Sequence, residues 1–83
     1  MSERWLKCKV FRGMFSDERT VQFLSKNGET SSAFVPESTV RGQVDGQGMV
    51  KVLVFQEEST AWAMLPTEDR LFLPVQEGDL VEA

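Results

Sequence analysis

Hydrophobic and polar residues alternate with a period of two along much of the chain, which predicts short β-strands. The first such run covers residues 5–11. Leu6, Cys8 and Val10 share one face of it, and the residues between them share the other. Because one face of a half-buried strand meets the core, we expect Leu6, Cys8 and Val10 to point inward.

Two further runs, residues 19–25 and 30–35, flank the tetrapeptide Lys26-Asn27-Gly28-Glu29. Asn-Gly between strands is typical of a two-residue hairpin in which both central residues have a positive φ. Pro36 should end the third strand, because proline cannot donate to a β-ladder. One turn of 3₁₀ helix can follow at residues 36–39.

Residues 49–56 form the clearest strand pattern of the chain, with Val50, Val52 and Val54 on one face and more apolar residues on the other. Apolar residues on both faces predict a central strand. Residues 60–65 and 71–75 are the next strands, and Pro74 places the second of them at an edge. Residues 80–81 can add a last bridge.

Five or six short strands without a segment of helical period predict an all-β fold, a small partly open barrel over residues 1–83 as a single domain. The segment Pro74-Val75-Gln76-Glu77-Gly78-Asp79-Leu80-Val81 resembles the turn-then-strand close of small SH3-like and OB-like barrels. We expect the SH3-like form, with the OB-like form as the alternative. The sequence shows no internal repeat.

Composition supports a folded, β-rich chain: 41% of the residues are hydrophobic and 27% are charged. No apolar stretch approaches the length of a transmembrane span, and no signal peptide is visible at the N-terminus. We therefore expect a cytoplasmic protein that does not bind membranes. One cysteine and no histidine leave neither a disulfide nor a usual zinc site.

No pattern in the sequence indicates catalysis, a metal or a cofactor. Cys8, the single thiol, should be buried and inert. The glycines at 42, 46 and 48 do not match a phosphate-binding loop. The acidic pairs at 17–18, 57–58 and 68–69 are typical of solvated turns. With no histidine to act as a base, we expect a binding module and not an enzyme.

The second face of the first strand is the candidate binding surface. It carries Trp5, Lys7, Lys9 and Phe11, with Arg12 at its end. Aromatic rings interleaved with cations suit single-stranded nucleic acid, and they equally suit an acidic, apolar peptide. A net charge of −4 disfavours a polyanion. A protein partner or self-association is therefore the first expectation, and single-stranded nucleic acid is the alternative.

Two further apolar features stand outside this surface. Met14 and Phe15 lie in the connection after the first strand, where we expect them to plug the mouth of the barrel, with a partner interface as the alternative. Trp62 and Met64 share one face of the strand at 60–65, and the residues between them share the other. Only one of these faces can meet the core, so Trp62 should lie beneath a loop or at an interface.

Overall fold

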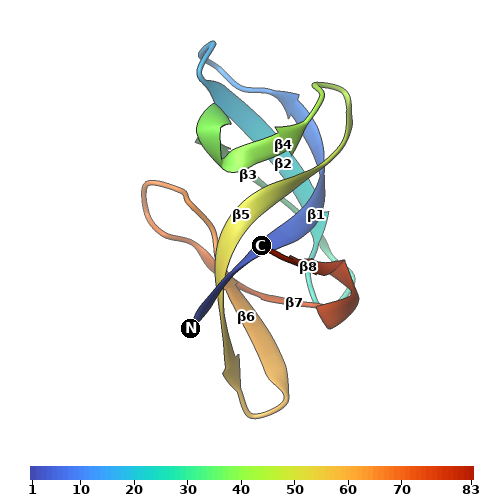
Figure 1. The fold of residues 1–83 in the computed structure, drawn as a ribbon. Helices are drawn as coiled ribbons and strands as arrows, with labels where there is room; N and C mark the ends of the chain where they lie inside the picture. The colour runs from blue at the N-terminus through green and yellow to red at the C-terminus, as the bar shows by residue number, and fades with distance from the viewer.

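The computed structural model describes all 83 residues as one antiparallel sheet that curls into a partly open barrel (Figure 1). Strands account for 63% of the chain, which confirms the predicted all-β class. The elements are β1 (Ser2–Arg12), β2 (Glu18–Leu24), β3 (Thr30–Pro36), η1 (Glu37–Thr39), β4 (Val40–Gly42), β5 (Gly46–Glu57), β6 (Thr60–Met64), β7 (Phe72–Val75), η2 (Glu77–Asp79) and β8 (Leu80–Glu82). Both η elements are single 3₁₀ turns.

The two longest strands, β1 and β5, lie antiparallel at the centre of the sheet. The strand order is β3-β2-β1-β5-β6-β7, with β4 added to β5 and β8 added to β1. The hairpin β2–β3 thus pairs with the C-terminal part of β1, and the hairpin β6–β7 pairs with the C-terminal part of β5. Figure 1 shows the turn between β1 and β2 at the top of the molecule and the turn between β5 and β6 at the bottom.

The concave side of the sheet holds a single core of small and branched side chains. Its members are Leu6, Cys8, Val10, Val21, Phe23, Val35, Val50, Val52, Val54, Ala61, Ala63, Leu65, Val75 and Leu80. The predicted inward faces of the strands at 5–11, 49–56 and 60–65 are therefore confirmed. Complete burial of these side chains is the main term that stabilises a chain of this size.

The order of elements repeats: three strands, a 3₁₀ turn and a short strand occur once in residues 2–42 and again in residues 46–82. The two 3₁₀ turns match in their geometry. Pro36 and Gln76 before them have φ −62° and −86°, and Val40 and Leu80 after them have φ −119° and −100°. In each turn the residue after the helix donates its N–H to the carbonyl oxygen of the glutamate that begins it.

The strand registers relate the two halves by a pseudo-twofold axis. Leu6 pairs with Val50 and with Leu80, while Val50 pairs with Leu6 and with Val40. Leu6 and Val50 are therefore counterparts of each other, as are Val40 and Leu80. The axis passes between Leu6 and Val50.

The registers of the other strand pairs assign a counterpart in the second half of the chain to the residues of each strand in the first half. The core pairs are Leu6 and Val50, Cys8 and Val52, Val10 and Val54, Val21 and Ala63, Phe23 and Leu65, Val35 and Val75. All twelve side chains belong to the buried core. The structure thus contains a repeat that the sequence does not show, because the connections differ in length and few counterparts are identical.

The hairpin between β2 and β3 has the predicted glycine but a different turn. Gly28 has φ +85°, whereas Asn27 has no positive φ. The Ser25 N–H donates to Glu29 O at 2.9 Å, and the Gly28 N–H donates to Ser25 O at 3.0 Å. The loop therefore has three residues and only its last is left-handed, so the prediction of a two-residue turn is wrong.

The two strands at the ends of the sheet each contain a proline. Pro36 is the last residue of β3, and Pro74 lies inside β7, which confirms its predicted place at an edge. The Lys26 N–H donates to Pro74 O at 2.8 Å and links the β2–β3 loop to β7. Lys26 Nζ also donates to Thr60 Oγ1 at 2.9 Å, so Lys26 links the β2–β3 loop to both β6 and β7 where the barrel stays open.

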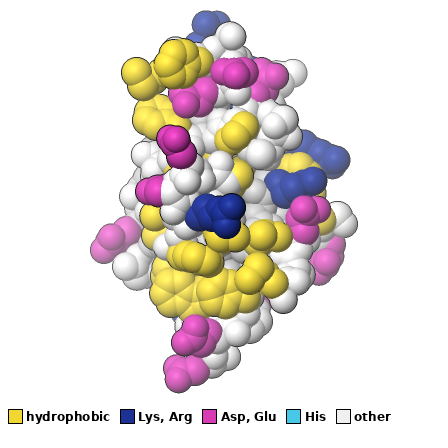
Figure 2. Space-filling view, turned by 90° about the vertical axis from the view of Figure 1, so that its left-hand side faces the viewer, with side chains coloured by type: hydrophobic (Ala, Val, Ile, Leu, Met, Phe, Trp, Pro, Cys, Tyr) yellow, Lys and Arg dark blue, Asp and Glu magenta, His cyan; other side chains and the backbone are white.

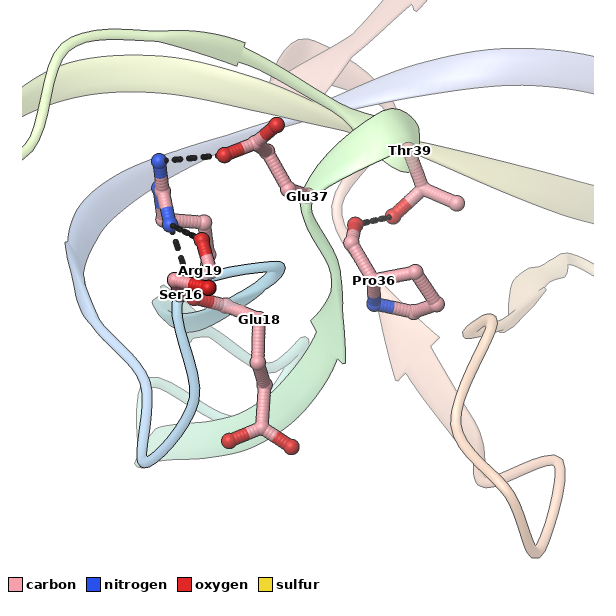
Figure 3. A network of polar contacts seen from close by, with 6 residues as sticks. All are labelled: Ser16, Glu18, Arg19, Pro36, Glu37 and Thr39. Atoms are coloured by element: carbon pink, nitrogen blue, oxygen red, sulfur yellow. Dashed lines mark hydrogen bonds and ion pairs between the residues drawn. The ribbon is translucent and has the colours of Figure 1, made fainter.

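The connection between β1 and β2 is held against η1 by Arg19 (Figure 3). Its guanidinium donates to the carbonyl oxygens of Ser16 and Glu18 at 3.1 and 2.9 Å, and it bonds Glu37 Oε2 at 2.7 Å. Glu77, the counterpart of Glu37, also faces an arginine, because Arg4 lies 3.8 Å away. An ion pair thus supports the 3₁₀ turn in each half.

Candidate functional site

The convex side of β5, β6 and β7 carries a continuous apolar surface. We call it the outer apolar face and define it by Leu53, Phe55, Trp62, Met64, Phe72 and Pro74. The registers place Leu53, Met64 and Phe72 in one row. Phe55, Trp62 and Pro74 form the next row. These side chains point away from the core, which the alternate residues fill.

Contacts within the outer apolar face hold it together. The rings of Phe55 and Phe72 meet edge to face, with their centroids 5.4 Å apart. Phe72 keeps 45% of its surface exposed, and the other five side chains are half-buried. The prediction that one face of residues 60–65 meets the core is confirmed. Trp62 lies on the other face, among aromatic and aliphatic neighbours.

The first half of the chain provides an internal comparison for this surface. The counterparts of the six residues, in the same order, are Lys9, Phe11, Thr20, Gln22, Ser32 and Phe34 on β1, β2 and β3, and they form the same two rows. Four of these six are polar. Because the same architecture accepts polar residues at these positions, the fold does not require Leu53, Trp62, Met64 and Phe72 to be apolar.

Charged residues flank the outer apolar face at its two ends. Glu57 is the last residue of β5, and Glu58 follows it in the turn to β6. Arg70 lines a groove of about 440 Å³ together with Leu53 and Met64, at the opposite end of the strands. None of these three charges forms an ion pair within the chain. Figure 2 shows a broad hydrophobic area with one basic side chain directly above it and acidic side chains below it and at both sides.

Trp5, the first residue of the predicted binding surface, is buried. Its ring is only 6% exposed, although it lies outside the core cluster. The guanidinium of Arg41 stacks 4.5 Å from the ring centroid, and Lys51 Nζ lies 5.4 Å from it. Two cation–π contacts therefore cover the ring with side chains of β4 and β5.

Lys7 and Lys9 are exposed, as the alternation predicts, and they line a groove of about 380 Å³. The groove opens where β1 leaves its partner β8 and joins β2. Nine residues line it, and the counterpart of each one lines the groove that contains Arg70. The pseudo-twofold axis therefore gives the molecule two equivalent grooves with different linings.

The remaining two residues of the predicted surface lie at the C-terminal end of β1, outside this groove. Phe11 is half-buried on the convex face of β1, and Arg12 is exposed at its end.

Met14 and Phe15 are 75% and 67% exposed, so the prediction that they plug the barrel is wrong. The core at that end of the sheet contains Val10 and Val21, which pair across β1 and β2, and does not include Met14 or Phe15.

Cys8 is buried between Leu6 and Val10, as predicted. Burial disfavours the thiolate and raises the pKa of the Cys8 thiol from its ordinary value of 9.0 to about 11. A thiol that is protonated at neutral pH is a weak nucleophile. No three histidine, cysteine or acidic side chains lie close enough together to hold a metal ion.

No protein family, curated protein or solved structure matches the chain. The structure contains no helix with the length and apolar character needed to cross a membrane. The geometry of the chain itself is therefore the basis for a functional proposal.

Proposed function

We propose that this chain is a non-enzymatic interaction module that binds a protein through the outer apolar face. The observation that carries the proposal is the difference between the two halves. Equivalent positions on the convex side are mostly polar in the first half and entirely apolar in the second. Apolar side chains that packing does not require are typical of interaction surfaces.

The type of partner follows from the composition of the face. Trp62, Phe55 and Phe72 offer large, rigid rings of the kind that dominates protein interfaces. Arg70 and the acidic turn supply a polar border at each end. A net charge of −4 and an apolar surface both favour a protein over a polyanion.

Replacing residues of the face by their counterparts tests the proposal. Trp62→Thr with Phe72→Ser places the residues of the first half on the second, in positions where the fold accepts them. Phe15→Ser with Phe34→Ser is the matched control, because it removes exposed aromatic rings elsewhere. Tagged forms of the three proteins are used to capture partners, including untagged copies of the chain itself.

We expect the wild type and the control to capture the same partners and the variant of the face to lose them. Retention of every partner by that variant would contradict the proposal. Thermal unfolding of all three proteins checks that the substitutions leave the fold intact.

A second candidate function, binding of single-stranded nucleic acid, rests on the groove lined by Lys7 and Lys9. Neither lysine forms an ion pair within the chain. The burial of Trp5 removes one of the rings that this function would use for stacking. Titration of an oligonucleotide at several salt concentrations tests it, since phosphate contacts give a steep salt dependence that Lys7→Glu with Lys9→Glu would abolish.

A further inference from the structure

We infer that the partner of the outer apolar face is a second copy of this chain, packed face to face about a twofold axis that runs perpendicular to β5. This inference rests on the proposed function and names its partner. Most homomeric proteins use such isologous interfaces, in which one patch meets the same patch on its partner. A patch can do so only when its shape and charge are complementary to themselves.

The charges that border the face meet this condition. Glu3 and Lys51 near the Arg70 end form an ion pair with each other, and Glu68 and Asp69 line a separate groove beside Phe34. Arg70 lies at one end of the strands, and Glu57 and Glu58 lie at the other. A twofold axis in the plane of the face and perpendicular to the strands makes the two β5 strands antiparallel. It therefore brings Arg70 of each copy over the acidic turn of the other. An axis parallel to the strands would place like charges together.

The edge strand next to the outer apolar face is protected against pairing with another chain, so association through the face is favoured over association through this edge. β7 is the end strand nearest to it, and Pro74 leaves that strand without one backbone donor. The carbonyl oxygen of Pro74 already accepts from the Lys26 N–H. Pairing of β7 with another β7 is therefore blocked at its centre, and proline in an end strand is a common protection against edge-to-edge association.

The core of the interface would be aromatic. In the proposed arrangement the row of Phe55 and Trp62 packs against the row of Met64 and Phe72 from the partner. Each copy then covers the exposed edge of the Phe55–Phe72 ring pair. Six side chains form a small interface next to the roughly 800 Å² that each partner contributes to a stable complex. We therefore expect self-association that depends on protein concentration.

Sedimentation of the purified chain over a wide range of concentrations tests the inference. We expect a monomer–dimer equilibrium in the wild type and in Phe15→Ser with Phe34→Ser. Trp62→Thr with Phe72→Ser should remain monomeric throughout. A wild type that is monomeric at every concentration would overturn the inference, as would a dimer that survives this substitution.

Charge exchange tests the direction of packing. Arg70→Glu alone, and Glu57→Arg with Glu58→Arg alone, should each weaken dimerisation about tenfold, because each creates two like-charge contacts per dimer. The triple variant restores the complementarity and should recover the wild-type dissociation constant. The antiparallel arrangement is wrong if Arg70→Glu alone and Glu57→Arg with Glu58→Arg alone dimerise as the wild type does. It is also wrong if the triple variant does not recover the wild-type dissociation constant.

The two proposals fail in different ways. If the chain stays monomeric but captures another protein through the outer apolar face, the inference that the partner is a second copy is wrong. The proposal that the chain is an interaction module is then supported. A chain whose captured partners are unaffected by Trp62→Thr with Phe72→Ser contradicts both.

Discussion

Leu6 and Val50 face each other across the β1–β5 pair, and each is the counterpart of the other in the two halves of the chain. Both side chains are fully buried. A pseudo-twofold axis that passes through a core pair makes the two halves comparable position by position. Each half therefore shows which residues the architecture tolerates in the other.

Cys8→Val places at Cys8 the residue that its counterpart, Val52, already provides. Both positions are buried at the same level of the barrel. We expect the free energy of unfolding at pH 7 to change by less than about 1 kcal/mol, because the swap roughly conserves volume and adds no polar group. Chemical denaturation measures it, and a loss above about 2 kcal/mol would contradict the equivalence of the two positions.

The same variant tests the pH dependence that Cys8 creates. The folded state raises the thiol pKa from 9.0 to about 11, so folding favours the protonated form. The stabilisation from this group is therefore complete below pH 9 and is lost as the pH rises to 11, amounting to about 2 to 3 kcal/mol. Wild type should lose more stability than Cys8→Val over this interval, and parallel curves would contradict the shifted pKa.

Val52→Ala tests the core beneath β5. Val52 is 2% exposed and lies among core side chains. Removing two methyl groups leaves a cavity, and we expect a loss of roughly 1–3 kcal/mol. Lys7→Ala on the neighbouring strand is the control and should stay within about 0.5 kcal/mol, since its side chain is exposed. Equal effects in urea denaturation would place Val52 outside the core.

The strands and the core could be predicted from the sequence because both depend on local alternation. Val50, Val52 and Val54 are separated by single residues, so the alternation within residues 49–56 is enough to identify the buried face of β5. The burial of Cys8 follows from the same rule. The left-handed Gly28 could also be predicted, but the loop length could not, because it depends on which residues pair across the hairpin.

The candidate site was harder to predict, because it depends on contacts between distant segments. Alternation puts Trp5 beside Lys7 and Lys9, but it carries no information about Arg41, which comes from β4 and covers the ring. The outer apolar face likewise joins three strands. The unusual placement of Trp62 was visible in the sequence, but Phe72 joins it only through the β6–β7 register.

Gly28→Val tests the turn between β2 and β3. The backbone there has φ +85°, and no atom lies within 4 Å of where a Cβ would be. The cost therefore comes from backbone conformation alone, and we expect a loss of more than about 1 kcal/mol because branched residues resist this region. Gly28→Asn should cost less, since asparagine tolerates left-handed backbone better. Full stability of the valine variant would contradict the turn.

Gly48→Ala tests the close approach of β4 to β5. A Cβ at Gly48 would lie 2.2 Å from the carbonyl oxygen of Arg41 and 2.7 Å from a methyl group of Val10. The strands must separate to accept it, and we expect a loss of roughly 2 kcal/mol or more. Gly78→Ala is the control, because nothing lies within 4 Å of its Cβ and its φ is not positive. Thermal unfolding should separate the two variants clearly.

Arg41→Gln tests the cover over Trp5. The guanidinium stacks 4.5 Å from the ring centroid, and a glutamine cannot make the cation–π contact or shield the ring to the same extent. We expect Trp5 fluorescence to shift to longer wavelength and to be quenched more strongly by acrylamide. Trp62→Phe is the background, so that Trp5 is the only emitting tryptophan. Arg12→Gln on that background is the control and should leave the emission unchanged. Equal quenching in both variants would mean that Lys51 and the neighbouring strands shield the ring without Arg41.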